Sequence, residues 1–178
     1  MPAAIRLGAL DYHLLPRQGW RSLALAIALG VGFGAYMAIA DRTVFAAAIP
    51  EAQRATLAAN GLAARLAFYA RGAVIDEIAY RLIAMTALTW GLAWLSGRAG
   101  RTVHWAAIAL TALVIYPLGN WPYFLALDPS GLTLARELAL HGAAGLLWGW
   151  LYWRHGWLSG LAGHVGAHLA LQPLLTLA

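Results

Sequence analysis

Long apolar stretches, interrupted by single arginines and short polar turns, run through most of the chain. A helix of about 20 apolar residues is long enough to cross the hydrocarbon core of a bilayer. On this pattern we expect five membrane-spanning helices, at residues 22–40, 72–96, 102–121, 132–153 and 157–177. The predicted fold class is therefore all-α: a polytopic transmembrane helical bundle in which residues 1–178 form a single integral membrane domain.

The segment between the first two predicted spans has a different pattern. Four arginines punctuate its alanine-rich turns: Arg42, Arg54, Arg65 and Arg71. Pro50 followed by Glu51 is typical of a helix start, and Asn60 followed by Gly61 is typical of a helix stop. We therefore expect two short interfacial helices within residues 41–71, in addition to the spans.

Composition supports a membrane protein and excludes several other classes. Of the 178 residues, 62% are hydrophobic and 11% are charged, which is too apolar for a water-solvated surface. The net charge of +5 comes from arginines that stand singly between apolar runs. We therefore expect contact with membrane lipid, in a bacterial inner membrane, and no binding of nucleic acid. The absence of cysteine excludes disulfides and thiolate chemistry.

The second predicted span carries three charged side chains, which are costly in a bilayer. At the centre of a helix each costs on the order of 2.5 to 3.5 kcal/mol. Glu77 and Arg81 lie four residues apart and can neutralise one another as an ion pair. Asp76 points about 100° away from Glu77 around the helix, as a base, a metal ligand or a carboxylate at the water interface.

Two histidines in the last predicted span share one helix face. His164 and His168 lie four residues apart, and Gly163 and Gly166 allow another helix to approach closely. With a carboxylate from a second helix, such a pair can bind a divalent metal such as zinc or polarise a water molecule. The tentative metal set is His164, His168 and Asp76. The alternative is that both rings make hydrogen bonds between packed helices.

Other polar residues of the predicted spans carry weaker signals. Asn120 ends the third span, where an asparagine is usually a cap or an interfacial group, and Pro117 before it should kink the helix. His104, His141 and His155 are isolated histidines near turns or on apolar faces. We interpret these three histidines as structural.

Three segments, in order, resemble motifs of the CPBP family of intramembrane proteases, also called Abi proteins, which includes the prenyl-protein CAAX endoproteases. The family pattern is Glu-Glu-x-x-x-Arg, then Phe-x-x-x-His, then His-x-x-x-Asn or Asp, on separate transmembrane helices. Residues 76–81 are similar to the first motif, residues 116–120 to the second and residues 164–168 to the third. The resemblance covers a core at residues 72–170.

The resemblance implies an acid- and histidine-dependent endopeptidase, with these catalytic residues: Asp76, Glu77, Arg81, Asn120, His164 and His168. In the family the first glutamate and the histidine of the second motif activate water, while the third motif binds the oxyanion or a metal. Here aspartate replaces that glutamate, Asn120 replaces the histidine, and His168 replaces the asparagine. We hypothesise that His168 assists the base and that Asn120 donates its amide to the oxyanion.

Two function classes follow from these residues. The first is a CPBP-like endopeptidase, a metalloenzyme if the metal set is occupied, that hydrolyses a peptide bond of a membrane-protein substrate. The second is a catalytically degenerate CPBP-fold protein that serves as an accessory or assembly subunit of a larger membrane complex, among whose subunits it would find its partners. A transporter is disfavoured by the small number of spans and the lack of inverted repeats.

Overall fold

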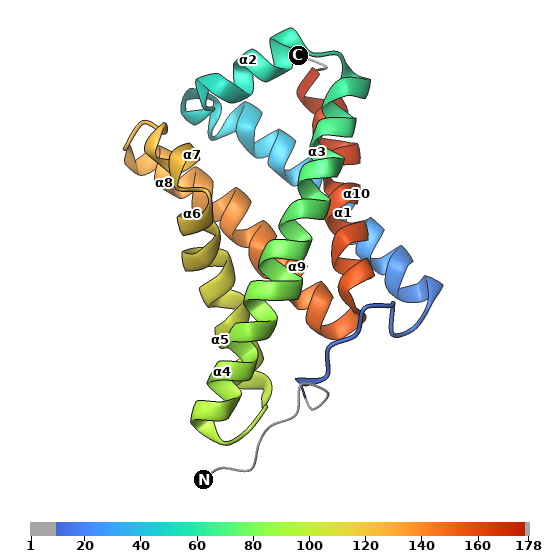
Figure 1. Cartoon of the computed structure of the whole chain (residues 1–178). Helices are drawn as coiled ribbons and strands as arrows, with labels where there is room; N and C mark the ends of the chain where they lie inside the picture. The colour runs from blue at the N-terminus through green and yellow to red at the C-terminus, as the bar shows by residue number, and fades with distance from the viewer. Residues whose placement is uncertain (1–9, 177–178) are drawn as a thin grey trace.

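The computed structural model describes residues 10–176, and these residues form helices and connecting turns without a strand (Figure 1). The predicted all-α class is therefore confirmed. In chain order the elements are α1 (Trp20–Thr43), the 3₁₀ turn η2 (Ala46–Ala48), α2 (Glu51–Ala59), α3 (Leu62–Asp76), the π segment η3 (Glu77–Met85), α4 (Thr86–Ser96), α5 (Arg101–Leu110), the π segment η4 (Thr111–Ile115), α6 (Tyr116–Gly119), α7 (Trp121–Leu125), α8 (Gly131–Glu137), the π segment η5 (Leu138–Gly142), α9 (Ala143–His155) and α10 (Trp157–Thr176).

Three helices are long and apolar enough to cross a membrane, which indicates a membrane protein. They are Trp20–Thr43, Leu62–Ser96 and Arg101–Gly119. The prediction of five spans is thus supported only in part. The helix at residues 131–155 carries Arg136, Glu137 and Arg154, and α10 carries two histidines and a glutamine. These polar residues lower the mean hydropathy of both helices.

The start of the second predicted span is wrong, and one of the two interfacial helices does not exist as a separate element. Pro50 and Asn60 flank α2 as predicted. The next helix, however, begins at Leu62 and continues without a break to Ser96. Arginine is a good helix former, so the arginines of this segment do not interrupt the helix. The predicted end of the last span, Leu177, lies outside the described residues.

Helices α1 and α10 pack with their backbones in close contact. A Cβ added at Gly30 would lie 2.0 Å from the carbonyl oxygen of Gly163, and one at Gly34 would lie 2.1 Å from that of Ala167. Only glycine permits this approach, as is typical of helix contacts within membranes. The contact fixes the height and rotation of α10, whose histidines face the interior.

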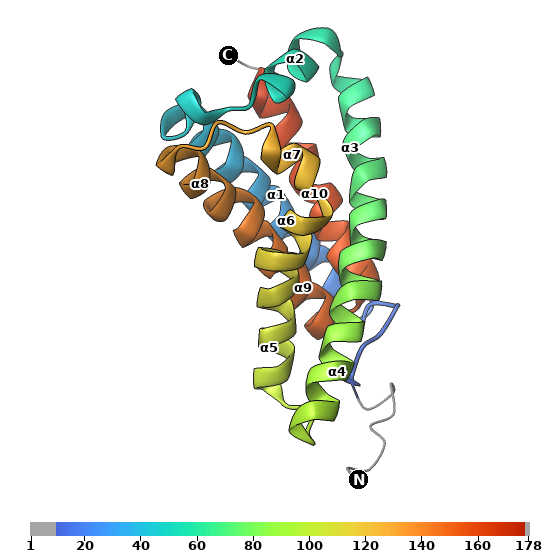
Figure 2. The same ribbon diagram turned by 60° about the vertical axis from the view of Figure 1, so that its left-hand side comes forward.

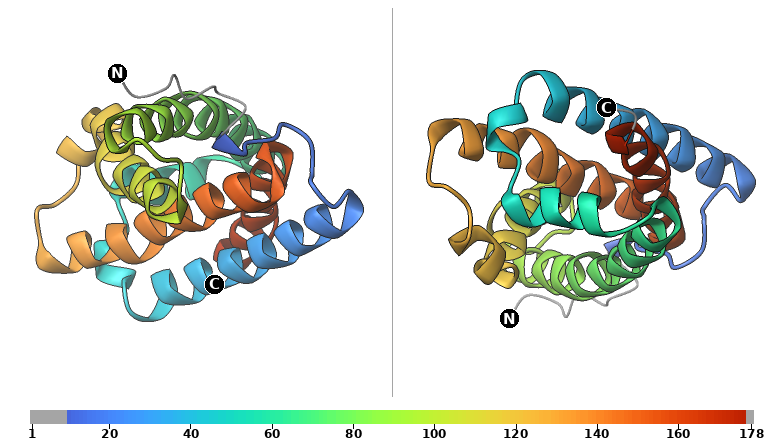
Figure 3. Two further views of the ribbon diagram at one scale, coloured as in Figure 1. Left: turned by 90° about the horizontal axis from the view of Figure 1, so that it is seen from below. Right: turned by 90° about the horizontal axis from the view of Figure 1, so that it is seen from above.

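The helices leave α9 between α1 on one side and the long helix α3–η3–α4 on the other, as both end views show (Figure 3). At one end of this bundle the short helix α2 crosses near the last turns of α10 (Figures 1 and 2).

Arg65 on α3 joins α2 and α10 at this end of the bundle. Its guanidinium donates to the carbonyls of Leu57 at 3.2 Å, Asn60 at 3.0 Å and Gln172 at 3.2 Å, so it caps the carboxyl ends of both helices.

At the other end of the bundle, the turn between α9 and α10 is hydrogen-bonded to the N-terminal segment. The backbone N–H groups of Trp157 and Leu158 donate to the carbonyls of His13 at 2.8 Å and Leu14 at 3.0 Å. These donors belong to the first turn of α10 and have no partner within that helix. Gly156 between the two helices has φ +96°, a conformation that favours glycine. The hairpin predicted for the last two spans is present.

Candidate functional site

A cavity of about 490 Å³ lies inside the bundle and is lined by many polar side chains. Its lining residues come from α1, α2, α3, α6, α7, α8, α9, α10, the π segment η5 and the turn between α6 and α7. Its polar lining consists of Asp41, Gln53, Thr56, Tyr69, Asp76, Tyr116, Asn120, Tyr123, Arg136, His141, His164, His168 and Gln172. Four of the six predicted catalytic residues thus face one cavity: Asp76, Asn120, His164 and His168.

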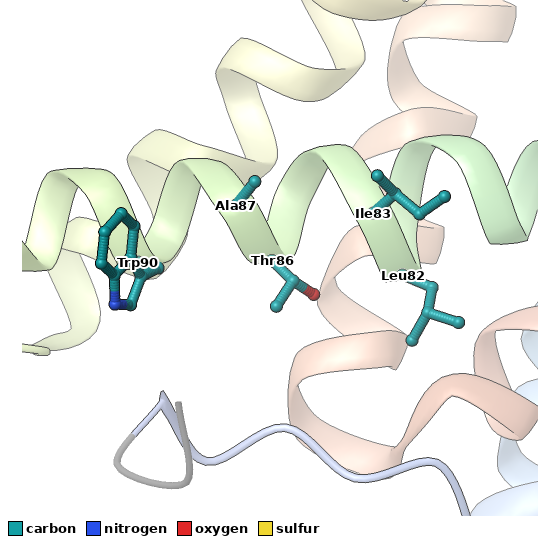
Figure 4. Close-up of a pocket in the computed structure, with 5 residues that line it drawn as sticks. All are labelled: Leu82, Ile83, Thr86, Ala87 and Trp90. Atoms are coloured by element: carbon teal, nitrogen blue, oxygen red, sulfur yellow. The ribbon is translucent and has the colours of Figure 1, made fainter. Parts of the chain in front are cut away.

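A second hollow lies on the outer side of η3 and α4 and differs in kind. Leu82, Ile83, Thr86, Ala87 and Trp90 line its volume of about 430 Å³ along one side of the helix (Figure 4). The hydroxyl of Thr86 already pairs with that of Tyr152 at 2.9 Å. This lining offers no acid or base, so we take the internal cavity as the candidate functional site.

Glu77 and Arg81 lie behind the cavity wall and orient His164. The carboxylate of Glu77 accepts a hydrogen bond from Nδ1 of His164 at 3.1 Å, and Nε of Arg81 lies 3.5 Å from the same oxygen. The predicted ion pair between Glu77 and Arg81 is therefore confirmed. Because Nδ1 faces the glutamate, Nε2 of His164 keeps its lone pair and can accept a proton.

His141, which we interpreted as structural, forms a second pair of the same kind. The ring lines the cavity, and its Nδ1 lies 2.6 Å from Oε2 of Glu137, four residues earlier. Arg136 donates to the other oxygen of Glu137 at 2.8 Å, as Tyr123 does at 3.1 Å. The cavity therefore receives two imidazoles, each oriented by a glutamate that an arginine balances. The Glu-x-x-x-His spacing at residues 137–141 was the signal that sequence analysis missed.

Arg136 also joins this pair to the first helix and to α2. Its guanidinium binds Asp41 through two hydrogen bonds of 2.7 and 2.9 Å and donates to Oε1 of Gln53 at 2.8 Å. The amide of Gln53 returns a hydrogen bond of 3.3 Å to Asp41. A bidentate pair with further hydrogen bonds offsets the desolvation cost of burying both charges. Burial raises the pKa of Tyr123 in α7, which keeps its hydroxyl a donor to Glu137.

Local backbone geometry helps to aim these side chains. Glu77 and Arg81 lie in the π segment η3, and His141 lies in the π segment η5. A π turn shifts the rotation of the following residues relative to a regular α-helix, and such turns recur at functional sites. The hydrophobic period of the sequence cannot predict this shift.

Asp76 lies on the cavity wall one residue before the buried ion pair. Within residues 10–176, no hydrogen bond or ion pair engages its carboxylate. By contrast, the carboxylates of Glu77 and Glu137 are both bound. Asp76 is consequently the acid of the cavity that is available to a water molecule or a ligand.

Asn120 occupies the rim of the cavity in a fixed orientation. Its amide nitrogen donates to the hydroxyl of Tyr80 at 2.8 Å and to the carbonyl of Tyr116 at 3.0 Å. These bonds use both hydrogens of the amide, so donation to an oxyanion by Asn120 would require breaking one of them. The contact fixes the orientation of the Asn120 amide against Tyr80.

His168 is held by ring stacking. Its ring lies 4.9 Å from that of Tyr69 and 5.4 Å from that of His164, which in turn lies 5.6 Å from that of Trp148. Its Nδ1 is buried with no partner among the described residues. Across residues 10–176, no group of three or more histidine, aspartate or glutamate side chains is arranged to hold a metal ion. The tentative set of His164, His168 and Asp76 therefore lacks geometric support.

No family model, no curated protein and no solved structure matches this chain. The resemblance to CPBP proteases consequently stays a prediction that rests on the three short motifs.

The absence of cysteine allows a direct test of the cavity. Ala144 lines it, whereas Ala107 is fully buried outside it. In lipid nanodiscs, Ala144→Cys should react with a small charged methanethiosulfonate roughly tenfold faster than Ala107→Cys, because the thiol ionises only in contact with water. Mass spectrometry measures the labelled fraction against time. Equal rates for the two variants would mean that water does not enter the cavity.

Proposed function

We propose that this chain is a CPBP-like endopeptidase that hydrolyses a peptide bond at the membrane, with an acid and two histidines as its reactive groups. One observation carries the proposal: Asp76, His141 and His164 face a single cavity, and a glutamate orients each imidazole. Unbound acid beside imidazoles with available Nε2 atoms is an arrangement that activates water.

The reaction follows from these groups. A water molecule lies between Asp76 and an imidazole. The imidazole takes a proton from this water as the water oxygen attacks the carbonyl carbon of the substrate. The carbonyl oxygen becomes an oxyanion in the tetrahedral intermediate. The C–N bond then breaks, and the proton taken from water passes to the leaving amine. The products are a carboxylic acid and an amine, so the step requires only water.

The glutamates serve as positioning residues in this scheme. Glu77 and Glu137 fix the tautomer and direction of His164 and His141, and they stabilise each ring when it becomes charged. Arg81 and Arg136 contact these glutamates and balance their charge within an apolar bundle. In this scheme His141 supplies the histidine that the second CPBP motif would have at position 120, where this chain has asparagine.

We further propose that the helix at residues 131–155 and α10 also cross the bilayer, which makes five spans in a bacterial inner membrane. Their lengths of 25 and 20 residues suffice for a crossing. Ionisable residues within spans usually face the bundle interior, and Arg136, His141 and His164 do so here.

The second candidate is a catalytically degenerate CPBP-fold subunit of a larger membrane complex. Asp76 favours it, because an aspartate reaches one methylene less far than the glutamate of the family motif and can misplace the attacking water. Exposed tryptophans on the outer faces, Trp94 and Trp105, offer contacts to other subunits as well as to lipid.

Reporter cleavage by the purified protein tests the proposal. The reporters are single apolar helices of about 20 residues joined to different extended segments, each with a fluorophore and a quencher on either side of the segment. The protein alone in nanodiscs should cleave at least one reporter, and Asp76→Asn should not. Absence of cleavage by the wild type, together with subunits that co-purify in mild detergent, would favour the accessory role. Loss of cleavage with a chelator and recovery with zinc would reinstate the metal.

A further inference from the structure

Gln172 is a buried polar side chain whose amide has no hydrogen-bond partner in the described structure. It lies on α10 one turn after His168, lines the cavity and is 2% exposed. Its Oε1 is buried with no partner, and no hydrogen bond within residues 10–176 engages the rest of its side-chain amide. Burying an unpaired amide costs roughly 1 to 3 kcal/mol. Such a group in a cavity is best explained by a ligand that pairs with it.

Gln53 lines the same cavity, and both ends of its side-chain amide are hydrogen-bonded within the protein. Its Oε1 accepts from Arg136 at 2.8 Å, and its Nε2 donates to Asp41 at 3.3 Å. Both ends of that amide are used inside the protein. Gln172 differs in that no hydrogen bond within residues 10–176 engages its side-chain amide.

The neighbours of Gln172 define what the ligand offers. The side-chain amide combines an acceptor and a donor, which matches the N–H and C=O of a peptide group. His168 beside it adds another ring nitrogen without a partner, and stacking on Tyr69 holds that ring in place. Arg65 binds only the backbone carbonyl of Gln172, and no charged side chain within residues 10–176 pairs with its side-chain amide, so the match is to a neutral amide group.

We propose that Gln172, with His168 beside it, binds a main-chain secondary amide of an extended peptide in the cavity. The inference rests on the proposed endopeptidase function and assigns a substrate-binding residue to it. Gln172 positions the peptide and takes no part in proton transfer.

Stability of the ligand-free protein gives the first test. Gln172→Leu replaces an unpaired amide by an apolar group of similar shape, so its midpoint of thermal unfolding should equal or exceed that of the wild type. Gln53→Leu, the matched control, should lower the midpoint because it removes the hydrogen bonds that Gln53 makes with Arg136 and Asp41. A midpoint of Gln172→Leu that falls as far as that of Gln53→Leu would mean that its amide is bound within the protein.

The second test is a double-mutant cycle that combines a substitution in the protein with a modification of the reporter. Backbone N-methylation at one position of the reporter should weaken wild-type kcat/KM about tenfold, the worth of one buried hydrogen bond. In Gln172→Leu the unmethylated reporter should lose the same factor, mainly through a higher KM, and methylation at that position should cause no further loss. Equal methylation losses at every position in both proteins would overturn the assignment of Gln172.

Binding separates the two proposals. Asp76→Asn in nanodiscs should bind the uncleaved reporter, and Asp76→Asn/Gln172→Leu should bind it about tenfold more weakly. If the wild type cleaves nothing but this difference in binding persists, only the endopeptidase function fails. If Asp76→Asn does not bind the reporter, the role of Gln172 fails as well.

Discussion

Replacing His141 by phenylalanine should lower reporter cleavage by about 10² to 10⁴-fold, the range that a positioned acid or base contributes. The ring lines the cavity next to the unbound carboxylate of Asp76 and is oriented by Glu137. Phenylalanine keeps the shape of the ring and removes both nitrogens. The same loss is expected for His164→Phe, because Glu77 orients that ring in the same manner. Initial rates with a cleaved reporter measure the effect.

Two kinds of control distinguish chemistry from folding in this experiment. His13→Gln changes an exposed histidine outside the cavity and should leave the rate unchanged. Glu137→Gln keeps a hydrogen-bond acceptor for His141 but removes its charge, so its rate should fall between those of wild type and His141→Phe. If His141→Phe retains full activity and His164→Phe does not, the second glutamate–histidine pair is structural and the site contains a single imidazole base.

The sequence was informative about which residues are costly to bury and less informative about where they meet. Asp76, Glu77 and Arg81 could be singled out because charges within an apolar run need compensation, and the pairing of Glu77 with Arg81 followed from their spacing. His164 and His168 could be placed on one inward face for a similar reason. These inferences depend only on the geometry of a single helix.

The role of His141 could not be inferred in this way, because it depends on contacts between helices. The π segment η5 alters the rotation of the residues around it, and Arg136 binds Asp41 across 95 residues of sequence. Asn120 illustrates the converse error: its position in a motif suggested an oxyanion donor, but its amide hydrogens are spent on Tyr80 and Tyr116. A motif defines residue types, whereas hydrogen bonding decides what they can still do.

The same contacts explain how an apolar bundle accommodates so many ionisable groups. Each glutamate of the two pairs contacts an arginine and a histidine, and these contacts offset the cost of burying its charge. The arginines lie behind the pairs and the imidazoles face the cavity. This order leaves Asp76 and Gln172 as groups whose partners must come from water or a ligand.

The largest expected effect on stability concerns the contact between α1 and α10. Gly34→Val should lower the free energy of unfolding by about 3 kcal/mol or more, which corresponds to a fall of about 6 to 12 °C in Tm. The new Cβ would lie 2.1 Å from the backbone oxygen of Ala167, and a backbone atom cannot turn aside as a flexible side chain does. Circular dichroism of the protein in detergent during heating measures the change.

Gly32→Val provides the matched control, because it makes the same substitution two residues earlier on α1, where a Cβ meets nothing within 4 Å. Valine is no worse than glycine for helix formation, so Tm should stay unchanged or rise slightly. Equal melting of the two variants would show that α1 does not pack on α10 through Gly34. Because α10 also carries His164 and His168, displacement of α1 by valine at position 34 should reduce reporter cleavage even below the melting transition, whereas valine at position 32 should not.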